Sequence, residues 1–62
     1  MGEPELMAFC VEVTGSAENA VDWLTSKSPL LEGRRPIDFT STPEGRTKIE
    51  RLLREAQAGF PI

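Results

Sequence analysis

Residues 42–59, TPEGRTKIERLLREAQAG, contain the start, the body and the end of one amphipathic helix. Thr42 is a favourable N-cap, Pro43 suits the first helical position, and Glu44 complements the positive end of the helix dipole. Gly59 follows the expected last turn. The apolar side chains recur on one face: Ile49, Leu52, Leu53 and Ala56. This spacing predicts a helix of roughly 16 residues.

Gly45 is unusual inside this predicted helix. Glycine in a helix interior costs about 0.5–1 kcal/mol relative to alanine. We therefore expect another backbone, or the ring of Trp23, to approach the helix closely at Gly45. The same pattern indicates that a larger side chain there would disrupt the fold.

Two more helices are predicted on the amino-terminal side, over residues 4–13 and 17–26. Pro4 is tolerated in a first turn, Gly15 is a typical helix end, and Ser16 is a good N-cap for the second helix. One apolar stripe is expected on each: Leu6, Phe9, Cys10 and Val13 on the first, and Ala17, Ala20, Val21 and Leu24 on the second. Trp23 lies beside the second stripe, where its indole N–H is expected to bond a backbone carbonyl.

The segment between the second and third helices is expected to be a loop over residues 29–35, followed by a short helical turn over residues 36–39. Pro29 ends the second helix, and Leu30 and Leu31 are expected to point inward. Gly33 permits a backbone reversal with positive φ. The sequence thus predicts an all-α fold, a small bundle of three main helices plus one short helical turn, forming one domain over residues 1–62.

The length of the chain suggests that it needs a partner. A chain of 62 residues buries only about 60% of the surface that its unfolded form exposes. Cys10 is the single cysteine and there is no histidine, so we predict neither an intramolecular disulfide nor a metal site. Met7 and Val11 lie outside the main stripe of the first helix. Either this helix packs between two neighbours, or Met7 and Val11 meet a second chain in self-association.

Charge and hydropathy argue against a nucleic-acid or membrane partner. The net charge is −3, and residues 1–24 hold five acidic groups and no basic one. A helix–turn–helix DNA reader over residues 4–26 would turn Glu18 and Asp22 toward phosphates, which is electrostatically unfavourable. No apolar run approaches the roughly 20 residues that span a bilayer, and the amino terminus does not resemble a signal peptide. We expect a cytoplasmic protein.

The chain does not have the residues of an enzyme. Without histidine, the thiol of Cys10 has no base to activate it, and we interpret Cys10 as a small core residue. The five glycines stand singly, so no phosphate-binding loop is indicated and no cofactor is expected. Recognition of another protein remains the favoured function.

The order of several short motifs resembles the toxin-binding domain of the Xre/MbcA/ParS family of bacterial antitoxins. The motifs are Ala20, Trp23-Leu24, Leu31-x-Gly33-x-x-Pro36, Thr42-x-x-Gly45, Leu52-Leu53 and Gly59, over residues 20–59. This sequence differs from the family pattern at Thr40-Ser41, where aliphatic residues are expected. The family's usual upstream DNA-binding domain is not among these 62 residues, so we expect either a piece of a longer protein or a stand-alone module.

The resemblance implies a function and a partner. Members of this family dock a toxin with a RES domain, an enzyme that consumes NAD, and the end of the module approaches the toxin's active-site cleft. By similarity, the expected contacts are Arg54, Gln57, Gly59, Phe60, Pro61 and Ile62. Phe60 could instead fold back on Leu53 or Ala56. The alternative function is a non-catalytic self-association or adaptor module, with Met7 and Val11 in a homo-oligomer interface.

Overall fold

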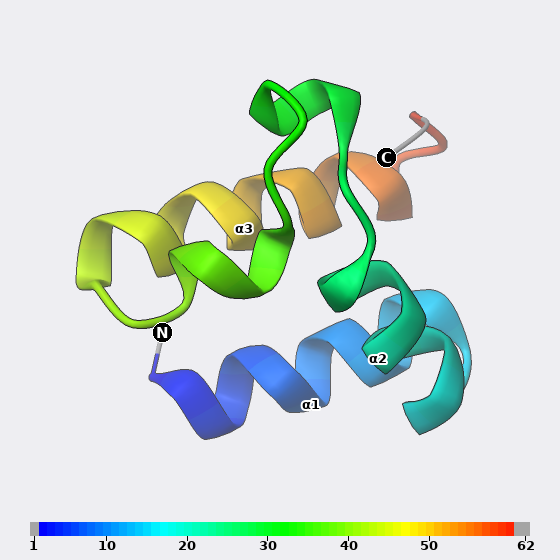
Figure 1. Cartoon of the computed structure of the whole chain (residues 1–62). Helices are drawn as coiled ribbons and strands as arrows, with labels where there is room; N and C mark the ends of the chain where they lie inside the picture. Colours follow the sequence, from blue (N-terminus) through cyan, green and yellow to red (C-terminus); the bar gives the residue numbers. More distant parts are fainter. Residues whose placement is uncertain (1, 61–62) are drawn as a thin grey trace.

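The computed structural model describes residues 2–60, which form three α-helices and two short 3₁₀ helices. In chain order they are α1 (Glu3–Thr14), α2 (Ala17–Thr25), η1 (Pro29–Leu31), η2 (Pro36–Phe39) and α3 (Pro43–Gln57). Figure 1 shows α1 and α3 running in the same direction, with α2 near the end of α1. The predicted all-α fold is confirmed, and the predicted helix bounds differ from these by at most one residue at any end.

The helix ends use the residues that the sequence indicated. The hydroxyl of Ser16 accepts a hydrogen bond from the backbone N–H of Asn19 at 3.0 Å, and that of Thr42 accepts one from Gly45 at 3.0 Å. Gly15 ends α1 with φ of 99°, and its N–H donates to the carbonyl of Val11. These contacts satisfy backbone groups that a helix terminus otherwise leaves unpaired.

The connection between α2 and η2 is more ordered than the expected loop, because it contains η1 and closes on itself. The N–H of Ser28 donates to the carbonyl of Arg34 at 2.9 Å, and the N–H of Gly33 donates to the carbonyl of Ser28 at 2.9 Å. Gly33 has the predicted positive φ, at 80°. Glu32 also has a positive φ, at 58°, and ends η1.

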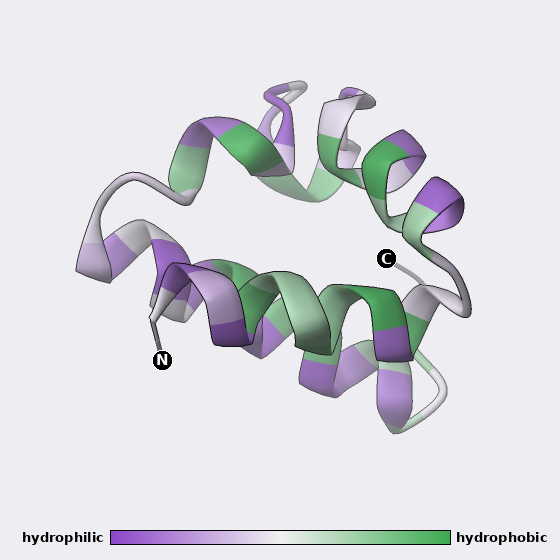
Figure 2. Cartoon of the chain, turned by 90° about the horizontal axis from the view of Figure 1, so that it is seen from below, coloured by the Kyte–Doolittle hydropathy of each residue, from purple (hydrophilic) through white to green (hydrophobic). Residues whose placement is uncertain are grey.

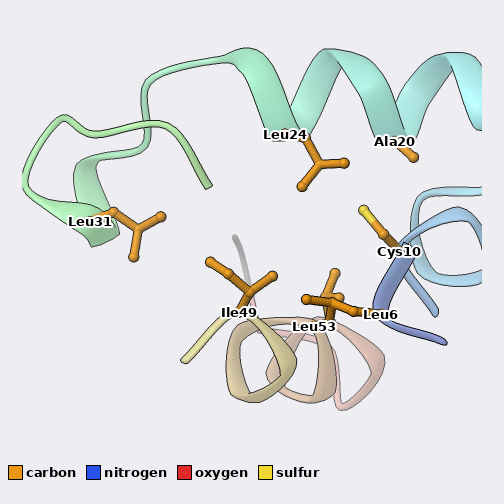
Figure 3. Close-up of a cluster of buried hydrophobic side chains, with 7 residues drawn as sticks. All are labelled: Leu6, Cys10, Ala20, Leu24, Leu31, Ile49 and Leu53. Carbon is orange, nitrogen blue, oxygen red and sulfur yellow. The ribbon is translucent and has the colours of Figure 1, made fainter. Parts of the chain in front are cut away.

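The core is formed by side chains from α1, α2, η1 and α3 that converge on one centre (Figure 3). Its members are Leu6, Cys10, Ala20, Leu24, Leu31, Ile49 and Leu53. In Figure 2 hydrophobic and hydrophilic bands alternate along the ribbon, as expected for helices with one apolar side. Within residues 2–60, no helix is both long enough and apolar enough to cross a bilayer.

Some expected core positions are wrong. Leu30 is 50% exposed and Val21 is 58% exposed. Successive residues of a 3₁₀ helix point about 120° apart, so Leu31 can face the core only if Leu30 does not. On α2, only the i, i+4 pair Ala20 and Leu24 is buried. The fold instead buries three positions that the periodicity did not select, Ser28, Pro36 and Thr40.

Candidate partner-binding site

The end of α3 has a fixed geometry set by Gly59. The N–H of Phe60 donates to the carbonyl of Glu55 at 3.0 Å, and the N–H of Gly59 donates to the carbonyl of Ala56 at 3.0 Å. Gly59 has φ of 96°. This pair of bonds around a left-handed glycine is a Schellman motif, which satisfies the last carbonyls and turns the chain away from the helix axis.

Phe60 projects from this turn, with 64% of its surface exposed. A Schellman motif usually pairs the residue after the glycine with an apolar residue near the helix end. Here the residue at that helical position is Glu55, which is exposed and charged. Any contact of Phe60 with Leu53 or Ala56 therefore leaves most of Phe60 in solvent.

The other expected contact residues lie on the same end of α3. Arg54, Gln57 and Gly59 are exposed. The guanidinium of Arg54 is held in place, because it donates to the carboxylate of Glu50 at 2.9 Å and lies 5.7 Å from the ring centre of Phe9. Two further expected contacts, Pro61 and Ile62, lie outside the described residues. The structure thus brings the described members together on one exposed helix end.

A groove adjoins this helix end, with a volume of about 780 Å³. It lies where α1, α2 and α3 all end, and the sequence analysis did not identify it. The side chains that define it include Glu12 and Val13 from α1, Asp22 and Trp23 from α2, and Ala56 and Gln57 from α3. The one sequence signal pointing to it is the acidic first third of the chain, residues 1–24.

Trp23 forms part of this groove and does not make the hydrogen bond expected of it. Its Nε1 is buried and has no hydrogen-bond partner among residues 2–60. Trp23 packs against the core but is only partly buried. Packing alone, rather than a polar contact, therefore sets the orientation of the indole.

The electrostatics of the groove favour a cation. Glu12 and Asp22 make no ion pair within residues 2–60, where the pairs are Arg35–Asp38 and Arg54–Glu50. The carboxyl ends of α1 and α3 also carry partial negative charge, although Asn19, in the first turn of α2, lines the groove as well. No lysine or arginine within residues 2–60 lines the groove; Arg34, for example, lies 4.8 Å from the ring centre of Phe39.

The two residues considered for self-association differ in their surroundings. Met7 is partly buried and packs against the core, whereas Val11 is 36% exposed. Both lie on α1, one helical turn apart. Val11 is therefore the member of this pair that is more available to a second chain.

Cys10 lies in the core, 1% exposed, and burial raises the pKa of its thiol above the ordinary value of 9.0. A raised pKa keeps the thiol in its neutral, weakly nucleophilic form at neutral pH. Among residues 2–60, no three acidic or cysteine side chains gather closely enough to hold a metal ion.

The fold and this exposed helix end define a small all-α module with a surface suited to protein contacts. Residues 11–59 match the model of the antitoxin Xre/MbcA/ParS C-terminal toxin-binding domain. This match covers most of the chain, and the chain belongs to that family of antitoxin domains. The resemblance noted in the sequence is thereby confirmed.

One curated relative is the 6-hydroxy-3-succinoylpyridine 3-monooxygenase HspA of Pseudomonas putida (strain DSM 28022 / S16). It is 32% identical over 56 residues, which cover 84% of this chain. The chain spans only 18% of the length of that relative. No solved structure gives a significant match.

Proposed function

We propose that this chain is an antitoxin module that neutralises a RES-domain, NAD-consuming toxin by covering the entrance to its active site. Membership of the antitoxin toxin-binding family, over residues 11–59, carries this proposal. The family supplies the class of partner, a toxin. The RES domain and the NAD chemistry of that toxin belong to the proposal.

The end of α3 supports the proposed mode of binding. Interfaces draw most of their affinity from a few aromatic and arginine side chains that become buried in the complex. Phe60 is a large apolar side chain left in solvent, and Arg54 is a guanidinium already ordered by Glu50. A side chain that is ordered before binding loses less entropy in the complex. The proposed toxin contacts are Arg54, Gln57, Gly59, Phe60, Pro61 and Ile62.

Inhibition in this proposal is steric, and the chain performs no chemistry and holds no cofactor. Burial of Cys10 keeps the only thiol away from substrates. A sequence without histidine has no side chain whose ordinary pKa suits proton transfer at neutral pH. The activity in the name of the longer relative is not carried over, because the matched segment is only 18% of that protein. The complex is proposed to form in the cytoplasm.

Co-expression tests the proposal directly. Cells that express a RES-domain toxin should keep their NAD when they also express the full chain, and the two proteins should co-purify. A variant ending at Ala58 removes the tail but leaves α3 within its observed bounds. It should lose at least about tenfold in toxin affinity by calorimetry, because the apolar anchor is gone. A full chain that neither protects NAD nor co-purifies with any RES-domain toxin would rule the proposal out.

Self-association remains the second proposal, because Val11 leaves an apolar side chain exposed on α1. A second copy that covers Val11 and the accessible part of Met7 would stabilise a small fold. Sedimentation of the isolated chain tests this: a dimer that dissociates in a Val11→Glu variant supports it. A monomer at all concentrations up to the millimolar range contradicts it.

A further inference from the structure

The groove beside the carboxyl ends of α1 and α3 combines the only tryptophan of the chain with the carboxylates of Glu12 and Asp22, which form no ion pair within residues 2–60. We propose that this groove binds a lysine or arginine side chain on a surface segment of the toxin. This inference rests on the proposed function for the identity of the partner. It adds a second contact, chemically distinct from the apolar tail at Phe60.

The negative charge of the groove is the first reason to expect a basic side chain there. Glu12 on α1 and Asp22 on α2 both line the groove, and neither forms an ion pair within residues 2–60. The groove also includes the last residues of α1 and α3, Thr14 and Gln57, whose helix ends are partially negative. Asn19, in the positively polarised first turn of α2, also lines the groove, so the two carboxylates supply most of the attraction for a cation.

The aromatic ring of Trp23 is the second reason to expect a basic side chain in the groove. Tryptophan is the best aromatic partner for a cation placed over its face, and a guanidinium can also stack on it. Trp23 is only partly buried and lines the groove. Because its Nε1 makes no hydrogen bond within residues 2–60, the ring can adjust its tilt without breaking one.

The apolar lining explains why a long basic side chain fits better than a small ion. Val13 and Ala56 lie beside Trp23 in the groove, and both are partly buried. Lysine and arginine carry an aliphatic stem that packs on such surfaces while the charged head reaches a polar group. A metal ion would lack these contacts.

The groove is also continuous with the proposed toxin contacts. Gln57 belongs to both surfaces, since it lines the groove and lies on the exposed end of α3. Phe60 follows Gln57 by three residues, beyond the turn at Gly59. A toxin that covers the end of α3 therefore also lies next to the groove. A lysine or arginine on the adjacent part of its surface can then enter the groove.

The single tryptophan makes the test direct, because the tryptophan fluorescence of the full chain comes from a residue that lines the groove. The probe is the capped tripeptide acetyl-Leu-Arg-Leu-amide, with acetyl-Leu-Gln-Leu-amide as its neutral match. We expect a saturable change in emission with the arginine peptide, weakening as salt rises from about 0.05 to 0.5 M. An equal response to both peptides, or no response to either, overturns the proposal.

Substitutions then locate the binding. Asp22→Asn and Glu12→Gln should each weaken the arginine peptide by roughly threefold, as expected for exposed charge pairs. Both positions are exposed and form no ion pair with the rest of the described chain, residues 2–60, so the variants should fold like the parent. Glu32→Gln is the matched control, because Glu32 is exposed and lies outside the groove. Equal weakening by Glu32→Gln would show a general charge effect and contradict the proposal.

The same variants in the toxin complex separate this inference from the proposed function. Asp22→Asn should weaken toxin binding even when the tail is intact. If the groove binds the peptide but the toxin ignores Asp22→Asn, the toxin is not the occupant and this inference fails while the proposed function stands. If the full chain binds no RES-domain toxin, the proposed function fails, whatever the peptide shows.

Discussion

The carbonyl oxygen of Phe39 occupies the space in which a β-carbon on Gly45 would lie. That β-carbon would also stand only 2.7 Å from the carbonyl carbon of Phe39 and 2.9 Å from the hydroxyl of Thr42. The close approach expected from the sequence is thus confirmed. Its source is the backbone of η2 rather than the ring of Trp23.

Replacement of Gly45 by alanine should destabilise the protein by about 2–3 kcal/mol, because backbone atoms cannot move aside cheaply. Urea denaturation followed by circular dichroism measures this loss. Thr47→Ala is the matched control, since Thr47 is exposed on the same helix and alanine favours helices. Equal stability of Gly45→Ala and the parent chain would contradict the close packing of α3 on η2.

Thr42→Ala should cost about 1 kcal/mol, because the hydroxyl of Thr42 satisfies the N–H of Gly45 at the start of α3. Thr42→Ser keeps a hydroxyl in the same position and should retain most of that stability. Thermal unfolding of both variants checks the role of the cap. If serine and alanine destabilise equally, the capping bond contributes nothing.

The pH dependence of stability should show the burial of Cys10. Because burial raises the pKa of Cys10 above 9.0, the folded state favours the neutral thiol. Its contribution is complete below about pH 9 and is lost as the pH rises through the pKa of the folded state. Melting temperatures from pH 7 to 10.5 should therefore fall more steeply for the parent than for Cys10→Ala.

At neutral pH, Cys10→Ala should itself lose about 1 kcal/mol through the small cavity that it leaves. The decisive quantity is the difference between the two proteins in how steeply the melting temperature falls with alkaline pH, since the lysines titrate in both proteins. Parallel slopes would show that the thiol is not desolvated by the fold.

Phe60→Ala should separate binding from folding. Phe60 is 64% exposed, so its truncation should change stability by less than about 0.5 kcal/mol. If Phe60 anchors the toxin, affinity should fall at least about tenfold. Leu30→Ala is the matched control, since Leu30 is 50% exposed on a different element and should leave toxin binding unchanged. A strong stability loss with unchanged affinity would assign Phe60 a structural role instead.

Local chemistry made much of this fold predictable. The helix ends are set by contacts between residues close in sequence. Ser16 and Thr42 cap a helix start with a hydroxyl, and Gly15 and Gly59 end a helix with a positive φ. Such signals need no knowledge of the tertiary structure. The helices could therefore be located to within one residue at each end.

Features that depend on tertiary packing were harder to predict. The choice between Leu30 and Leu31 depends on how η1 meets the core, and periodicity cannot select one of two adjacent leucines. Thr40 can be buried because its polar groups are satisfied: its hydroxyl donates to the carbonyl of Ile37, and its own carbonyl accepts from Arg46. The groove combines residues more than 40 positions apart, such as Glu12 and Gln57, and no local pattern joins them.

The seven core side chains in Figure 3 include no aromatic ring. Phe9, Trp23, Phe39 and Phe60 all lie at the periphery, partly buried or exposed. Near-ultraviolet spectra will consequently report on rings that surround the core and not on the seven central side chains themselves. Methyl resonances of the leucines and Ile49 are the signals that would reveal the melting of the interior itself.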